Sequence, residues 1–208
     1  MWEWKTGLAR CGVPVRIYLF DDLKQPNFPD HRVFYFPNLF HVDEARLKIL
    51  RDKVLSKNHV VVWGPGSGIS DGTTISKSSA AALTGFSFEM IPSNYPRRTL
   101  LTNFEHPITH GLSSATVLGG PLAYGPVLLP TDGVSLGIAW TKVGRNASGL
   151  SVKPMENWTS VFTTTPGLPA GMWRNLARMA GAHVYCQSDD VLMAGSNLVA
   201  LHVTSAGT

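Results

Sequence analysis

The glycine-rich segment GPGSG, residues 64–68, follows the apolar run HVVVW and is the first place in this sequence to look for chemistry. A strand that ends in such a turn can expose a nucleophile or cradle an anion with bare N–H groups. Ser67, between Gly66 and Gly68, is the hydroxyl candidate in the turn. The order of residues matches neither G-x-S-x-G nor the glycine-rich phosphate-binding patterns. The segment therefore favours a tight turn that needs glycine over a catalytic serine.

Two of the seven histidines, His106 and His110, have the i, i+4 spacing of some helical metal sites. Pro107 follows the first, however, and pushes His106 towards extended geometry. Glu105 is the one acidic neighbour, and neither cysteine lies in a C-x-x-C pair. The sequence therefore predicts no metal site, and it contains no motif that calls for a cofactor.

The carboxylates do not form an evident catalytic pair. A glycosidase needs two opposed acids, and most acids here fit helix caps, helix surfaces or turns. Glu89 and Asp71 remain, and nothing in the sequence pairs them. The six tryptophans are scattered, which favours core and interface packing over a sugar-stacking platform.

Composition limits the class of protein. The chain has 208 residues, of which 44% are hydrophobic and 15% charged, which suits one compact domain. The low charged fraction indicates that a partner chain or another domain covers part of the surface. The net charge of +4 is too thinly spread for nucleic acid, and no apolar stretch is long enough for a membrane span. We expect no signal peptide, a cytoplasmic location if the chain is complete, and two buried free thiols at Cys11 and Cys186, with a disulfide left open.

The elements that position the turn are strands alternating with helices. Val15, Ile17 and Leu19 alternate with polar residues and predict a strand, and residues 31–36 predict a second. Residues 43–57 form the clearest helix, with Asp43 as its N-cap, and residues 59–63 form a buried strand. A helix near residues 2–9 precedes them. This rhythm predicts a parallel sheet with helices on its faces.

The second half is richer in strands. We expect a short helix at 76–85, a strand and loop at 97–112, and little regular structure at 113–135. Strands are expected at 134–140, 148–155 and 158–165, with a hairpin-like loop at 142–148. A helix at 167–181, with Pro169 in its first turn and Gly181 as its C-cap, is followed by strands at 183–186 and 197–203. We divide the chain into an α/β core, 1–112, and a β-rich elaboration with a closing helix–strand segment, 113–208, of the same domain.

Several of these segments resemble a known family. LARCGVPVRIYLFDDL, RVFYFPNLFHVDEARLKILRDKVLSKNHVVVWGPGSGISDG and HPITHGL are similar to the class I glutamine-amidotransferase-like domain of beta-galactosidases, often called the trimerisation domain. The segment from Trp158 to Val203 resembles the end of such domains, and residues 113–135 match nothing in them. The resemblance implies a flavodoxin-like three-layer α/β sandwich with a mostly parallel sheet, plus extra strands in the C-terminal half. True amidotransferases carry a cysteine where this chain has Gly64-Pro65, so the resemblance implies a domain without its nucleophile.

Two functions follow as hypotheses. The first is a non-catalytic accessory or oligomerisation domain that self-associates or packs on a glycoside hydrolase catalytic domain. The second is a small carbohydrate-binding protein or hydrolase that uses the carboxyl ends of the parallel strands, where α/β sheets bind ligands. Asp21 and Pro65 would also lie near that rim. The candidate ligand-binding residues are Asn38, Gly64, Ser67, Gly68, Asp71 and His106.

Overall fold

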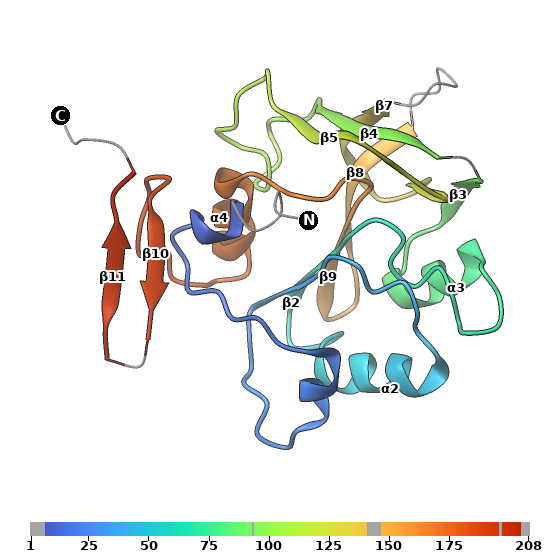
Figure 1. Cartoon of the computed structure of the whole chain (residues 1–208), viewed down its shortest axis with the longest axis horizontal. Helices are drawn as coiled ribbons and strands as arrows, with labels where there is room; N and C mark the ends of the chain where they lie inside the picture. The colour runs from blue at the N-terminus through green and yellow to red at the C-terminus, as the bar shows by residue number, and fades with distance from the viewer. Residues whose placement is uncertain (1–6, 93, 141–146, 196, 205–208) are drawn as a thin grey trace.

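One curled, mixed seven-stranded sheet organises the molecule (Figure 1). The computed structural model describes residues 7–92, 94–140, 147–195 and 197–204. The strand order is β1-β2-β9-β8-β7-β4-β5, and two short two-stranded sheets, β3-β6 and β10-β11, stand beside it. The strands of the large sheet are β1 Val33–Phe36, β2 His59–Trp63, β4 Tyr95–Leu101, β5 Val117–Tyr124, β7 Val134–Trp140, β8 Ala147–Pro154 and β9 Trp158–Thr163.

The parallel part of the sheet is small. β2 pairs in parallel with β1 and with β9, whereas every other strand pair in the sheet is antiparallel. The predicted strand–helix–strand unit is therefore confirmed for β1, α2 and β2. The prediction of a mostly parallel sheet is wrong, because the strands of the second half return through hairpins rather than through crossover helices.

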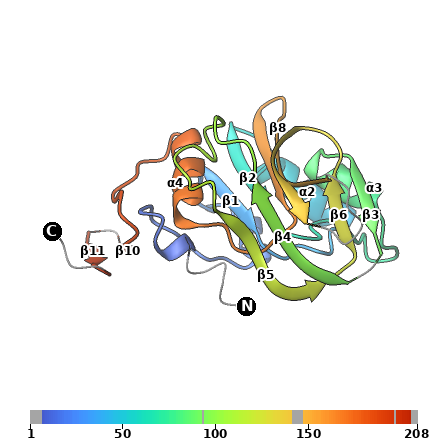
Figure 2. The same cartoon turned by 90° about the horizontal axis from the view of Figure 1, so that it is seen from above.

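Helices cover both faces of the sheet around β2. Val61 and Trp63 point into a core with α2 (Glu44–Lys53) and α3 (Lys77–Thr84). Val60 and Val62 point into a second core with α4 (Ala170–Met179). Every residue of β2 is buried, as its continuous apolar sequence predicts. The view from above shows α4 on one side of the strands and α2 and α3 on the other (Figure 2).

The helix boundaries follow local signals. Asp43 caps α2 and its carboxylate accepts from the Arg46 N–H at 2.8 Å. Gly85 ends α3 in the left-handed region, with φ of 77°. α4 begins at Ala170, three residues after the predicted start, because Pro169 is its N-cap, and it ends at Met179 with Ala180 rather than Gly181 as its C-cap.

Other sequence predictions need correction. Residues 15–19 belong to no strand, and a 3₁₀ helix, Phe20–Lys24, follows them. Residues 183–186 are irregular, because the N–H groups of Tyr185 and Cys186 both donate to the Gly12 carbonyl. The strand predicted at 197–203 is confirmed as β11 (Val199–His202), but its partner is β10 (Val191–Ala194).

The segment predicted to have little regular structure, 113–135, holds β5 and β6 (Val127–Pro130), and β6 pairs with an unpredicted β3 (Phe88–Ile91). Gly7, Leu8 and Ala9 form the end of the predicted first helix, whose earlier residues lie outside the described ones. Most of the predicted 142–148 loop also lies outside them. Among the described residues, no helix is long and apolar enough to cross a bilayer.

Candidate functional site

The turn after β2 is built against the end of β1. The Gly64 N–H donates to the Phe36 carbonyl at 2.8 Å, which draws the two chain segments together. A Cβ atom at Gly64 would lie 2.3 Å from the Pro37 carbonyl oxygen and 2.9 Å from its Cα. These neighbours are backbone atoms and cannot swing aside. Of the two positions at which the resemblance expects a cysteine, Gly64 therefore has no room for any side chain, and the other holds Pro65.

Ser67 faces inward. Its side chain is fully buried, and its Oγ donates to the Gly64 carbonyl at 2.9 Å, with the Phe36 carbonyl at 3.4 Å. A hydroxyl has one proton to donate, so these carbonyls hold it. Within the described part of the chain, no histidine accepts a hydrogen bond from Ser67. The Ser67 hydroxyl therefore stabilises the turn through hydrogen bonds, and because it is buried it is not accessible to a substrate.

The two flanking glycines are required by backbone geometry. Gly66 and Gly68 have φ of 74° and 71°, a region that side chains disfavour. A Cβ at Gly68 would also lie 2.8 Å from the Leu83 side chain of α3. The glycine-rich sequence is thus explained by a tight turn packed under α3.

Asp71 closes the next turn. Its Oδ1 accepts from the N–H groups of Thr73 and Thr74 at 2.8 and 2.7 Å, and both threonine hydroxyls donate to the same carboxylate. The N–H donors of Thr74 and Thr73 hold the pKa of Asp71 far below its ordinary value. The carboxylate is exposed and stays ionised, so its role in this structure is that of a turn cap.

Asn38 lies on the other side of the turn. Its side chain is exposed, and its carbonyl accepts from the Phe40 N–H at 2.8 Å. The Gly68 N–H donates to the neighbouring Leu39 carbonyl at 2.7 Å. The structure therefore brings Asn38, Gly64, Ser67 and Gly68 together at the carboxyl ends of β1 and β2, with Asp71 just beyond.

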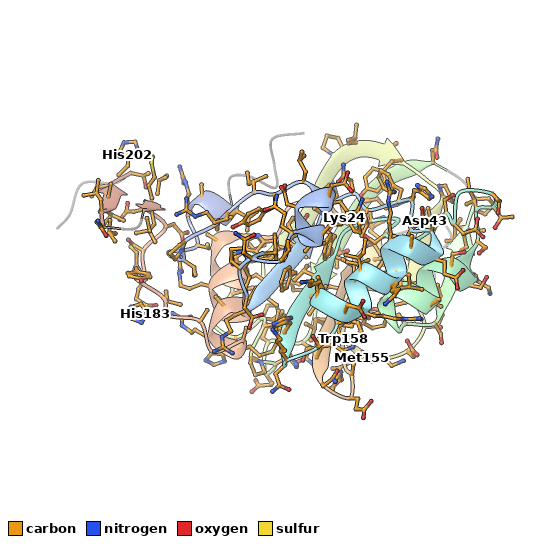
Figure 3. All side chains as sticks on the ribbon, turned by 90° about the horizontal axis from the view of Figure 1, so that it is seen from below. Lys24, Asp43, Met155, Trp158, His183 and His202 are labelled. Carbon is orange, nitrogen blue, oxygen red and sulfur yellow. The ribbon has the colours of Figure 1, made fainter. Side chains whose placement is uncertain are left out.

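His106 is not part of this group. It follows β4, which three strands separate from β2. Ile108, two residues later, belongs to the core on the α4 face, whereas Ile69 of the turn belongs to the opposite core. The half-buried ring accepts from the Ile108 N–H at 3.2 Å, and desolvation lowers the pKa of His106. His183 and His202 lie at the far end of the molecule from Asp43 of α2 (Figure 3).

A metal site would require several of the remaining cysteine, histidine and acidic groups to lie together. Among the described residues, no three His, Cys, Asp or Glu side chains are grouped as metal ligands. Both cysteines are free; burial raises the pKa of Cys11, and Cys186 is half-buried rather than buried as predicted. Trp63 and Trp173 are core residues, whereas Trp140 is exposed.

One recess near the rim was not predicted. A surface cavity of about 390 Å³ lies where the loop after β9 enters α4, with Arg10, Thr116 and Asp189 among its polar lining. Asp189 is held at 2.7 Å by the Arg174 guanidinium, so part of this lining is already neutralised. Its walls come from four segments that are distant in sequence, which is why no local sequence signal could reveal it.

Comparisons with known proteins find similarity in the fold of the chain but none in its sequence. No family model and no curated protein sequence matches the chain. Solved structures do: a beta-galactosidase from the Antarctic haloarchaeon Halorubrum lacusprofundi matches 92% of this chain with 13% identity and a TM-score of 0.62. One from Bacillus circulans sp. alkalophilus matches 91% with 11% identity and a TM-score of 0.65. Gan42B, a GH42 beta-galactosidase from G. stearothermophilus, matches 91% with 12% identity and a TM-score of 0.59.

The share of those proteins that is matched is small. This chain corresponds to 28%, 29% and 27% of the three solved chains. It therefore spans less than a third of the length of the beta-galactosidases that it resembles. The chain has the fold of a region that makes up less than a third of each of these beta-galactosidases.

Proposed function

We propose that the chain is a non-catalytic structural domain that packs beside the catalytic domain of a glycoside hydrolase, with an amidotransferase-like ancestry that has lost its nucleophile. The observation that carries the proposal is the turn after β2. Pro37 backbone atoms occupy the space that a side chain at Gly64 would need. Ser67, the remaining hydroxyl, donates to a buried carbonyl.

The comparisons support the glycoside hydrolase context. The similar region in three beta-galactosidases is less than a third of each chain, so in those proteins it sits within a larger structure. We also propose that the domain self-associates, as the name trimerisation domain implies for the family it resembles. We also propose that residues 1–112 and 113–208 are parts of one domain, because β2 pairs with β9 and β4 pairs with both β5 and β7.

The carbohydrate-binding alternative rests on the rim residues. Four of its six candidate residues meet at one turn, but their polar groups are largely used within the turn, and His106 lies elsewhere. Binding of a sugar at this rim stays a prediction that a galactose titration followed by amide chemical shifts would test.

The proposed structural role is tested by asking whether the chain raises the Tm of a glycoside hydrolase catalytic domain. The purified chain is mixed with a glycoside hydrolase catalytic domain encoded in the same genome, and the Tm of that domain is measured with and without it. A binding-linked rise in Tm that depends on chain concentration is expected. An unchanged Tm for each catalytic domain, together with separate elution on gel filtration, would contradict the proposal.

A further inference from the structure

The two cysteines stand near opposite ends of the sequence, but on segments that lie side by side (Figure 1). The carbonyl of Gly12, directly after Cys11, accepts from the N–H groups of Tyr185 and Cys186 at 2.8 and 3.3 Å. The contact is close, because a Cβ atom at Gly12 would lie 1.9 Å from the Cys186 carbonyl oxygen and 3.2 Å from its Cα. The backbone beside Cys11 therefore packs directly against the backbone of Cys186.

Arg174 of α4 ties the same two segments together a second time. Its Nη2 donates to the Arg10 carbonyl at 3.2 Å, one residue before Cys11. The same nitrogen donates to the Ser188 carbonyl at 3.0 Å, two residues after Cys186. The Arg174 side chain is largely buried, which shields this link from water. Two sets of hydrogen bonds thus fix the spacing of the segments around the two thiols.

This spacing is close to what a disulfide needs. The Cα atoms of a bridged pair lie within about 7 Å of each other. Consecutive Cα atoms are ~3.8 Å apart, so the contact of Gly12 with Cys186 places the Cα atoms of Cys11 and Cys186 at most roughly 8–9 Å apart. Both cysteines lie outside the helices and strands, so the backbone can adjust there without breaking a ladder.

In the reduced chain the two thiols make separate contacts. The Cys11 Sγ donates to the Val13 carbonyl at 3.6 Å, and the Cys186 Sγ lies 3.0 Å from the Ser188 Oγ. Neither contact is strong, because a thiol is a weak donor and a weak acceptor. A change of rotamer at each cysteine therefore costs little and turns the two sulfurs towards each other.

We propose that Cys11 and Cys186 form a reversible disulfide that locks the start of the chain to the segment leading into β10. The oxidant is a low-molecular-weight disulfide such as oxidised glutathione. The Cys186 thiolate attacks one sulfur of the oxidant and expels a thiolate, which leaves a mixed disulfide on Cys186. The Cys11 thiolate then attacks the Cys186 sulfur and expels the second thiolate. The protein loses two electrons and two protons, and the oxidant becomes two thiols.

The order of these steps follows from the burial of the two thiols. Cys11 is 2% exposed and belongs to the core on the α4 face, whereas Cys186 is half-buried and open to an oxidant from solvent. Burial raises the pKa of Cys11, and the Arg174 guanidinium opposes this rise less strongly. The mixed disulfide should accordingly form first, and closure of the protein disulfide should speed up as pH rises past ~8.5, the ordinary thiol range.

The test is intact-mass spectrometry of the full chain after incubation with mixtures of reduced and oxidised glutathione. Since the chain has two cysteines, loss of two hydrogen atoms from the monomer identifies the bond. The ratio of disulfide to dithiol at a fixed glutathione ratio should be at least about tenfold larger in the folded chain than in urea. The Tm of the oxidised chain should exceed that of the reduced chain by roughly 3 °C or more, and dithiothreitol should reverse the rise.

Two matched variants separate the steps. Cys11→Ser should stop at a mixed disulfide with one glutathione on Cys186, and Cys186→Ser should react at least about tenfold more slowly than wild type because its thiol is buried. Circular dichroism shows whether each variant folds, and Cys11→Ala replaces Cys11→Ser if a hydroxyl in the core disturbs folding.

A folded wild-type chain that stops at the mixed disulfide, or whose disulfide forms no more readily than in urea, overturns the inference. It concerns a single chain and goes beyond the proposed structural role. The Tm assay with a catalytic domain is run in dithiothreitol, where both cysteines stay reduced, so failure of one proposal is distinguishable from failure of the other.

Discussion

At the scale of single residues, the turn after β2 shows how a backbone can keep the shape of a reactive site and exclude its chemistry. Gly64 is held against Pro37, and Ser67 is turned inward to a carbonyl. Nucleophilic catalysis needs an exposed nucleophile within reach of a base. The polar atoms of this turn instead satisfy one another, which stabilises the connection between β2 and α3.

Gly64 should therefore tolerate no side chain. Gly64→Ala places a Cβ 2.3 Å from a backbone oxygen, and we expect a loss of about 3 kcal/mol of unfolding free energy, at the upper end of overpacking effects. Urea denaturation measures it. Gly195→Ala is the control, because its Cβ would meet only the Leu198 carbonyl oxygen, at 3.8 Å. Equal stability of Gly64→Ala and wild type would show that the turn has room for a nucleophile.

Tyr35 on β1 should make stability fall at high pH. Burial raises the pKa of Tyr35 to about 12, whereas an unfolded tyrosine ionises near ~10. As pH rises, Tyr35 therefore ionises in the unfolded state before it ionises in the folded state. Its contribution to the free energy of unfolding is fully present below pH ~10 and should be lost progressively as pH rises to about 12. Unfolding measured across this range should be steeper for wild type than for Tyr35→Phe. Parallel profiles for the two proteins would contradict the burial of this hydroxyl.

At the scale of elements, α2 depends on a local cap. Asp43→Ala removes the acceptor for the Arg46 N–H and should cost about 1 kcal/mol of unfolding free energy. Asp52→Ala, an exposed change on the same helix that breaks only the surface pair with Lys48, should cost less than half as much. The comparison is made by thermal or urea unfolding, and the reverse order of the two losses would be inconsistent with the cap.

The same elements show what sequence can and cannot predict. α2, α3 and β2 were predicted because their signals are local: a capping aspartate, a C-terminal glycine and a continuous apolar run. Residues 15–19 alternate like a strand, but Ile17 and Leu19 are exposed, and no strand in the described part of the chain pairs with them. β5 was missed because its glycines and proline resemble a loop, and its pairing with β4 is decided by distant residues.

Part of the candidate site could likewise be predicted from the sequence, and part could not. Gly64, Ser67, Gly68 and Asp71 lie within eight residues of one another, so their proximity follows from the sequence. Asn38 joins them through the parallel pairing of β1 with β2. His106 was wrongly grouped with the rim, because the antiparallel second half of the sheet carries β4 away from β2. The inward direction of Ser67 depends on the Gly64 carbonyl of the turn and the Phe36 carbonyl at the end of β1, which no spacing of residues reveals.

At the scale of the whole molecule, stability should be unevenly distributed. β2 and β9 lie in the middle of the helix-covered region, whereas β10 and β11 contribute nothing to the buried clusters of the described chain. In hydrogen exchange at low micromolar concentration, amides of β2 should exchange at the global unfolding rate, and those of β11 far faster. Uniform protection of all strands at low concentration would contradict this distribution.

The central claim is that the turn after β2 is structural and carries no nucleophile. It is tested by assaying wild type and Ser67→Ala for hydrolysis of a panel of nitrophenyl glycosides and of glutamine, while unfolding of both proteins is followed in parallel. We predict no turnover above buffer by either protein, together with a drop of about 1–2 kcal/mol in the unfolding free energy of Ser67→Ala, because the buried Gly64 carbonyl loses its hydroxyl donor. Turnover by the wild-type chain that disappears in Ser67→Ala would contradict the account.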